Sequence, residues 1–138
     1  MKVIIAGGRE VKDYGLVVKA MENADLLMGI TPTIVFSGRA RGVDKMGEDW
    51  AKQRGVPVQP FPAIWRDSDG VYDPRAGHRR NSEMAAKAQA LVAVWDGLST
   101  GTADMIKKAH KRGLLVWVEP ATSDTRLVRS SEAQLLGW

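Results

Sequence analysis

Residues 33–44 have the sequence TIVFSGRARGVD, in which a short apolar segment precedes a loop of small residues and the start of a helix. Residues 90–102, ALVAVWDGLSTGT, repeat this order, and residues 2–8, KVIIAGG, begin in the same way. Glycines let a ligand approach the backbone N–H groups of such loops, and a helix N-terminus adds about half a positive charge. Two complete loops of this kind indicate a site for a phosphorylated, nucleotide-like ligand.

The apolar pattern around these loops predicts alternating strands and helices. We expect strands at residues 2–6, 33–36, 56–61, 90–95 and 114–118. Helices are expected at residues 13–28, 44–54, 79–88 and 101–111. Pro57 and Pro60 place the third strand at an edge of its sheet. The alternation predicts an α/β fold, a Rossmann-like three-layer domain with a mainly parallel five-stranded sheet.

Two further segments complete the expected organisation. Residues 62–77 have no period and contain turn formers, which predicts a long loop of the functional or mobile kind. The domain is expected to span residues 1–120, with a C-terminal extension at residues 121–138. In such sheets a ligand binds beyond the carboxyl ends of the strands, and every loop named above lies at that edge.

Composition limits the classes of function. The chain has 138 residues, a net charge of +4 and no cysteine, so we expect one domain and no thiolate or disulfide chemistry. No apolar run reaches the roughly 20 residues that span a bilayer, and the first run is too short for a signal peptide. We therefore expect a cytoplasmic protein without membrane contact. The two histidines have no ligands at a metal-site spacing, and we expect no metal ion and no cofactor.

The candidate ligand-binding residues share three properties: glycines for close backbone approach, hydroxyl donors, and arginine forks for phosphate. They are Gly7, Gly8, Arg9, Ser37, Gly38, Arg39, Arg41, Gly42, Asp44, Arg79, Arg80, Asn81, Gly97, Ser99, Thr100, Gly101 and Thr102.

Some of these residues have two interpretations. Asp44 begins the second predicted helix, where it is either an N-cap or a contact for a ribose. Arg79 and Arg80 oppose the dipole at a predicted helix start, so they need an anionic partner, which is Glu83, Asp73 or, as we favour, a ligand phosphate.

The aromatic residues of the long loop, Trp65 and Tyr72, also have two interpretations. They either stack on a base or cover the cleft, and for Trp65 packing in the core is an equal alternative.

Several of these motifs occur together in a fixed order. They are Gly7-Gly8-Arg9, Ser37-Gly38 with Ala40-Arg41-Gly42-Val43-Asp44, Phe61-Pro62, Arg80-Asn81 with Met84, and Trp95-Asp96-Gly97 with Gly101-Thr102. Over about residues 1–118 this set resembles the YspA-like branch, found in bacteria and phages, of the SLOG superfamily. That superfamily joins the DNA-processing protein DprA (SMF) to the Lonely Guy phosphoribohydrolases. The resemblance implies a Rossmann-like fold that binds nucleotides or nucleotide-derived ligands.

The Lonely Guy enzymes cleave the N-glycosidic bond of a nucleoside monophosphate. Arg80 matches their helical arginine, and Gly101 and Thr102 match the Gly-Thr of their loop. Their catalytic glutamate falls on Met105 here, and a thioether neither stabilises an oxocarbenium ion nor activates water. For this activity the candidate catalytic residues are Arg80, with Asp44 or Asp96 as the carboxylate.

Three functions remain open at this point. The first is a protein that senses, sequesters or processes a small phosphorylated nucleotide derivative, and the second is the N-glycoside hydrolase. The third is a DprA-like binder of single-stranded nucleic acid, with arginines on the backbone and Trp65 and Tyr72 as stacking faces. The family tends to form homo-oligomers, and the apolar tail at residues 135–138 needs a surface to cover it, on a second subunit or on its own.

Overall fold

The computed structural model describes residues 1–122 and 124–137. Strands and helices alternate in the order β1 (Lys2–Gly7), α1 (Tyr14–Met28), β2 (Ile34–Ser37), α2 (Val43–Gln53), β3 (Val58–Pro60), α3 (Ala76–Lys87), β4 (Ala90–Trp95), α4 (Thr100–Lys111), β5 (Leu115–Pro120) and α5 (Thr125–Leu136). This order confirms the predicted α/β class. Within the described residues no helix has both the length and the apolar character that crossing a membrane requires.

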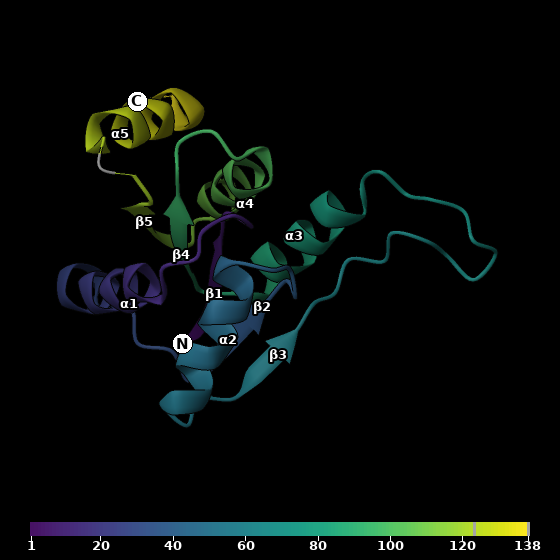
Figure 1. The fold of residues 1–138 in the computed structure, drawn as a ribbon, viewed down its shortest axis with the longest axis horizontal. Helices are drawn as coiled ribbons and strands as arrows, with labels where there is room; N and C mark the ends of the chain where they lie inside the picture. The colour runs from purple at the N-terminus through teal and green to yellow at the C-terminus, as the bar shows by residue number, and fades with distance from the viewer. Residues whose placement is uncertain (123, 138) are drawn as a thin grey trace.

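The five strands form one parallel sheet in the order β3-β2-β1-β4-β5 (Figure 1). β2 and β3 follow β1 on one side of the sheet, whereas β4 and β5 lie on the other side of β1. The strand order therefore reverses between β1 and β4, and the carboxyl ends of these two strands border a crevice. The prediction that the proline-containing third strand lies at an edge is confirmed.

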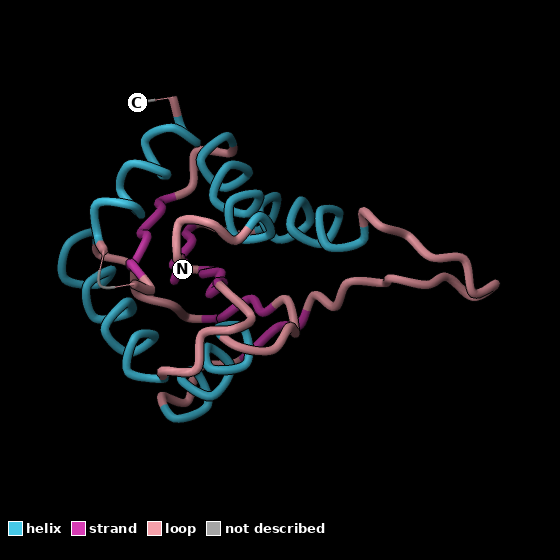
Figure 2. Tube along the Cα trace, turned by 45° about the horizontal axis from the view of Figure 1, so that its top comes forward, coloured by secondary structure: helices cyan, strands magenta, loops and turns pink. Residues whose placement is uncertain are grey.

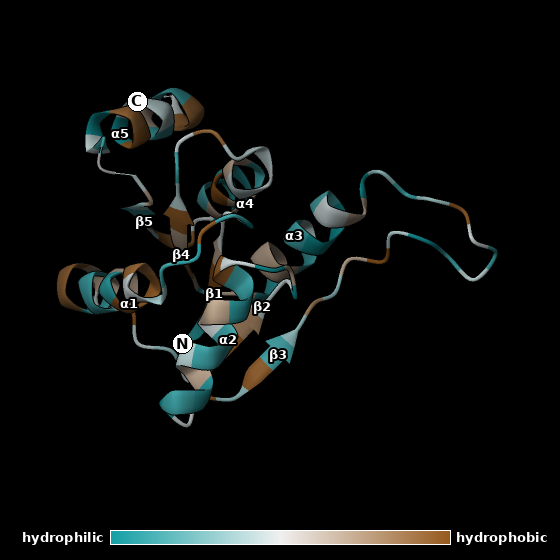
Figure 3. Cartoon of the chain, in the orientation of Figure 1, coloured by the Kyte–Doolittle hydropathy of each residue, from teal (hydrophilic) through white to brown (hydrophobic). Residues whose placement is uncertain are grey.

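Helices cover both faces of the sheet, which makes three layers. Alternate residues of β1 point to opposite faces: Val3 and Ile5 pack with α1 and α2, while Ile4 and Ala6 pack with α3, α4 and α5. Because β4 is buried on both faces, it is apolar throughout, as its brown colour in Figure 3 shows.

Two helix starts differ from their predictions. The prediction that α3 starts at residue 79 is wrong, because the helix begins at Ala76 and the two arginines lie one turn inside it. The N-cap interpretation of Asp44 is also wrong, because Gly42 is the N-cap of α2. The Asp44 carboxylate accepts a hydrogen bond from the Ala40 N–H instead, at 3.2 Å.

The C-terminal segment contains α5, which the sequence analysis did not predict. Val128 of α5 is fully buried in the core beneath α4, and Leu135 and Leu136 pack against the same core. The Arg129 guanidinium donates to the Val118 carbonyl oxygen at 2.9 Å, which ties α5 to β5. The two leucines are thus partly buried within their own chain. The last residue of that tail, Trp138, lies outside the described residues.

Residues 62–75 form an arm that extends away from the layered body (Figure 2). Its two sides pair through a bridge between Arg66 and Tyr72 and through the Asp73 N–H, which donates to the Trp65 carbonyl oxygen at 2.7 Å. The rings of Trp65 and Tyr72 stack with their centroids 6.2 Å apart. The predicted long loop is therefore a narrow, ordered excursion whose base lies beside α3.

Candidate functional site

A cavity of about 840 Å³ opens at the carboxyl ends of β1 and β4. Its walls come from the loop after β1, the start of α2, the first turns of α3, the start of α4 and the base of the arm. Pockets for small ligands have volumes of about 300–1,000 Å³, and in parallel sheets they lie where the strand order reverses. The cavity therefore has the size and the place of a ligand site.

Arg80 and Asp44 form one wall of the cavity. The Arg80 guanidinium donates from Nη1 to the Gly38 carbonyl oxygen and from Nε to Asn81 Oδ1, the latter at 3.0 Å. Two of its N–H groups are thus held by the protein, which fixes the plane of the fork. Burial lowers the pKa of Arg80, and the neighbouring Asp44 carboxylate opposes that shift.

Asp44 is a buried carboxyl group that lines a cavity. Burial raises the pKa of Asp44 to about 6. The hydrogen bond from the Ala40 N–H and the charges of Arg80 and Arg9 favour the ionised form and partly oppose this rise. A carboxyl group with a pKa of about 6 is mostly ionised at neutral pH and keeps roughly a tenth of its population protonated there, far more than an ordinary aspartate does. Asp44 therefore has the acid–base property that proton transfer requires.

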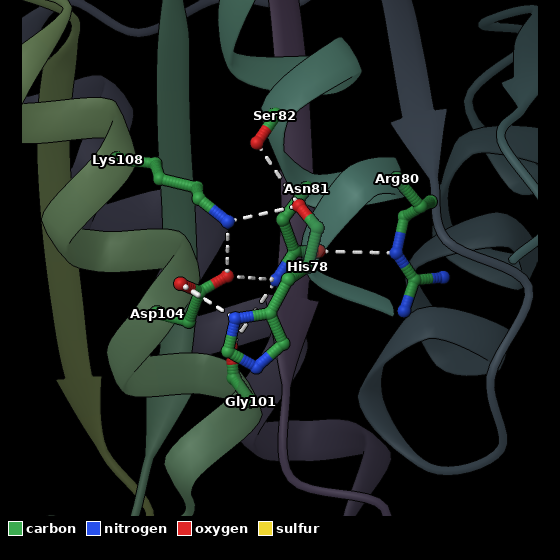
Figure 4. Close-up of polar contacts among 7 residues, drawn as sticks. All are labelled: His78, Arg80, Asn81, Ser82, Gly101, Asp104 and Lys108. Carbon is green, nitrogen blue, oxygen red and sulfur yellow. Dashed lines mark hydrogen bonds and ion pairs between the residues drawn. The ribbon is translucent and has the colours of Figure 1, made fainter. Parts of the chain in front are cut away.

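Next to Arg80, polar side chains join α3 to α4 (Figure 4). Asn81 of α3 donates to Asp104 of α4 at 3.0 Å and, more weakly, to the Gly101 carbonyl oxygen at 3.4 Å. Asp104 also accepts from Lys108 Nζ at 2.9 Å and faces His78 Nδ1 at 3.3 Å. These contacts hold the two helices together at the edge of the cavity.

The start of α4 contributes hydroxyl groups and first-turn amides. Ser99 and Thr102 approach each other, with 3.3 Å between their hydroxyl oxygens, and the Ser99 side chain makes no capping hydrogen bond. The first N–H groups of a helix have no partner within the helix. Asp96 Oδ1 accepts the N–H groups of Leu98 and Ser99 at 2.8 Å each, so this carboxylate shapes the loop as well as lining the cavity.

Eleven of the predicted site residues line the cavity. They are Gly7, Gly8, Arg9, Asp44, Arg80, Asn81, Asp96, Ser99, Thr100, Gly101 and Thr102. Segments far apart in the sequence thus come together as expected, and the roles assigned to these residues stay predictions.

The other predicted residues make contacts within the protein. The Ser37 hydroxyl and the Arg39 guanidinium both donate to the buried Glu48 carboxylate, each at 2.6 Å. Arg41 pairs with Glu10 at 2.5 Å in an exposed ion pair, and Arg79 pairs with Asp73 at 2.8 Å. Gly38, Gly42 and Gly97 lie where an added Cβ would meet neighbouring atoms.

Other residues of the cavity were not predicted as ligand contacts. His78, Gly77 and Met105 are among its lining residues, and so is Trp65, for which stacking was one of two interpretations. His78 lies two residues before Arg80, but its partner Asp104 is 26 positions later, so no local pattern in the sequence indicates the pair. Met105, the position of the Lonely Guy glutamate, is 1% exposed.

The residues present offer little to a metal ion. Within residues 1–122 and 124–137, no three histidine, aspartate or glutamate side chains gather closely enough to hold one.

Residues 1–67 match a family model described as the YspA, cpYpsA-related SLOG family. The matched segment runs from β1 through β3 into the arm, so it includes the loop after β1 and the loop before α2. No curated protein sequence and no solved structure matches the chain. The match over residues 1–67 confirms the resemblance that the motifs indicated: this part of the chain is similar to the YspA, cpYpsA-related SLOG family.

Proposed function

We propose that the cavity binds a small phosphorylated nucleotide or nucleotide derivative, which the protein senses, sequesters or processes. The observation that carries this proposal is the convergence of two guanidinium groups, Arg9 and Arg80, on a large cavity at the reversal of strand order. Each guanidinium lowers the free energy of a bound phosphate through charge-assisted hydrogen bonds.

The environment of Arg80 favours phosphate in particular. Its fork is oriented by Gly38 and Asn81, so little side-chain entropy is lost when the remaining N–H groups bind a ligand. Arg9 is exposed, and no ion pair or hydrogen bond to another described side chain occupies it. The charge of Arg9 and that of Arg80 act on Asp44 together, which requires the three groups to lie near one another.

Titration calorimetry with adenosine 5′-monophosphate and with adenosine tests the proposal. We expect the monophosphate to bind and the nucleoside to bind at least tenfold more weakly, because the two guanidinium groups have no anion to bind in adenosine. Mass spectrometry of the purified protein, intact and then denatured, identifies any nucleotide that it retains. Equal binding of both compounds, or binding of neither, together with an empty purified protein, would contradict the proposal.

A second function, N-glycoside hydrolysis of a nucleoside monophosphate, is supported by Asp44. This carboxyl group lines the cavity next to Arg80, and burial raises its pKa to about 6. A carboxyl group with this pKa can exchange a proton with water or with a leaving base near neutral pH. Chromatographic detection of free adenine from adenosine 5′-monophosphate, with loss of the product in Asp44→Asn, is the expected result for a hydrolase.

A further inference from the structure

His78 and Asp104 form a histidine–carboxylate pair at the wall of the cavity. His78 Nδ1 faces Asp104 Oδ1 at 3.3 Å, and the imidazole lines the cavity. In Figure 4 the opposite edge of the ring, which carries Nε2, points away from Asp104. In residues 1–122 and 124–137, no side chain forms a hydrogen bond with Nε2.

Both the backbone and the ring of His78 are tied to α4. Lys108 Nζ donates to the His78 carbonyl oxygen at 2.8 Å and to Asp104 Oδ2 at 2.9 Å. Asn81 Nδ2 donates to the same Oδ2 atom at 3.0 Å, which leaves Oδ1 to face the imidazole. The Asp104 side chain is only 16% exposed, so its orientation is set by these partners.

The pairing determines which ring nitrogen carries the proton. In a neutral imidazole one nitrogen donates and the other accepts, and the hydrogen bond made by one nitrogen fixes the role of the other. We assign the proton of the neutral His78 ring to Nδ1, which lies 3.3 Å from Asp104 Oδ1, and this leaves Nε2 as the acceptor. The side chains of Arg9 and Arg80 offer only donors, so an acceptor on His78 complements them within the same cavity.

An acceptor of this kind suits a hydroxyl group rather than a phosphate oxygen. We infer that His78, positioned by Asp104, accepts a hydrogen bond through Nε2 from a sugar hydroxyl of the bound nucleotide, so that the cavity selects ribonucleotides. This inference rests on the proposed nucleotide binding and adds to it the part of the ligand that is recognised.

Calorimetry at pH 8 tests the contact between His78 and a sugar hydroxyl. It compares adenosine 5′-monophosphate with its 2′,3′-dideoxy analogue, which lacks both ribose hydroxyl groups. For the unchanged protein we expect the ribonucleotide to bind about 3–10-fold more tightly, the effect of one hydrogen bond. In His78→Ala this ratio should fall to about 1. In His110→Ala it should not change, because the second histidine of the chain lies near the end of α4 and does not line the cavity.

A spectroscopic readout tests the positioning role of Asp104. In the His110→Ala background His78 is the only histidine, so the ¹⁵N spectrum of the imidazole reports one ring. We expect the proton on Nδ1, and in Asp104→Asn a shift of the population toward the Nε2–H form. An Nε2–H ring in the protein with Asp104 intact would overturn the inference.

The binding outcomes separate the two proposals. If both nucleotides bind the unchanged protein equally, nucleotide binding stands and the role of His78 is overturned. The same holds if the ratio survives in His78→Ala but is lost in Asp44→Asn, because Asp44 would then contact the sugar. If neither nucleotide binds, the proposed function fails and the inference fails with it.

Discussion

The loop after β2 and the loop after β4 look alike in the sequence but differ in the structure. Both follow a buried strand, contain glycine and small residues, and lead into a helix. In the loop after β2, Ser37 and Arg39 turn toward the buried Glu48, and Arg41 pairs with Glu10. After β4, Ser99 at the end of the loop and Thr100, Gly101 and Thr102 of the first turn of α4 all line the cavity.

The glycines of the two loops differ in the same way. Gly42 has a φ of +77°, and a Cβ there would clash with the carbonyl oxygens of Gly8 and Arg9. A Cβ on Gly101 would meet no atom within 4 Å. Gly42 of the first loop thus permits close packing of the chain, as does Gly97 of the second, where a Cβ would lie 3.3 Å from Ser131 Oγ, while Gly101 in the first turn of α4 leaves open space at the cavity.

The largest effect is expected for Gly42→Ala. The left-handed backbone at position 42 disfavours a residue with a Cβ, and the added atom would clash with two carbonyl oxygens. The free energy of unfolding should therefore fall by about 2–4 kcal/mol. Denaturant titration measures this change. A loss below about 0.5 kcal/mol would mean that the loop after β2 is as tolerant as the loop after β4.

Glu48→Ala should have the next largest effect. Glu48 is 2% exposed and accepts from Ser37 and Arg39. Its removal leaves the proton of the buried Ser37 hydroxyl without an acceptor, although the hydroxyl oxygen still accepts the Arg39 N–H at 3.1 Å. We expect the free energy of unfolding to fall by about 2–3 kcal/mol. Asp49→Ala, on the same helix and in an exposed pair with Lys45, is the control and should change it by less than about 0.5 kcal/mol.

Asp44 lies in the first turn of α2, directly after the first of the two compared loops, and lines the cavity. Its ionisation should affect the stability of the protein. Because burial raises the pKa of Asp44 from 3.8 to about 6, the folded state keeps a proton that the unfolded state has lost between these values. The contribution of Asp44 to stability should therefore decrease from pH 4 to pH 6 and stay low above.

The Asp44→Asn variant should remove this pH dependence. Above pH 6 the Asp44→Asn substitution should raise the free energy of unfolding by about 1–2 kcal/mol. This is less than the full pKa shift of Asp44 implies, because a neutral asparagine is not attracted to the charge of Arg80. Unfolding curves at pH 4, 5, 6 and 8 measure the difference. A variant whose stability follows that of the unchanged protein at all four values would show that burial does not raise this pKa.

Gly101→Ala should change stability least. Alanine is favoured over glycine in a helix by about 1 kcal/mol, and no atom opposes the added methyl group. We expect an unchanged or slightly higher free energy of unfolding and weaker binding of adenosine 5′-monophosphate, if the ligand approaches this backbone. Unchanged affinity would place the ligand away from the start of α4.

Most of the fold could be predicted because its signals are local. The strand at residues 90–95 was predicted with its exact bounds, since an apolar run buried on both faces has a clear start and end. The start of α3 is harder to predict, because Asp73-Pro74 is typical of a turn as well as of a segment that leads into a helix. The Asp73 carboxylate accepts the Arg75 N–H at 2.9 Å, just ahead of that helix.

The site was less predictable, because its contacts join distant residues. Arg39 and Arg80 are both arginines near glycine, and only the packing of α2 and α3 determines that one pairs with Glu48 and the other lines the cavity. The pairing of His78 with Asp104 depends on how α3 packs against α4. α5 was missed because few of its side chains are buried: among the described residues only Val128 and Glu132 are.

The central claim is that the ligand phosphate is bound by Arg9 and Arg80 and not by the arginines of the loop after β2. Calorimetry with adenosine 5′-monophosphate on two matched double variants, Arg9→Ala/Arg80→Ala and Arg39→Ala/Arg41→Ala, tests it most directly. We predict a loss of affinity of at least 1.5–3 kcal/mol, roughly 10–150-fold, in the first variant and a change below about threefold in the second. The reverse pattern, or equal losses in both, would contradict the claim.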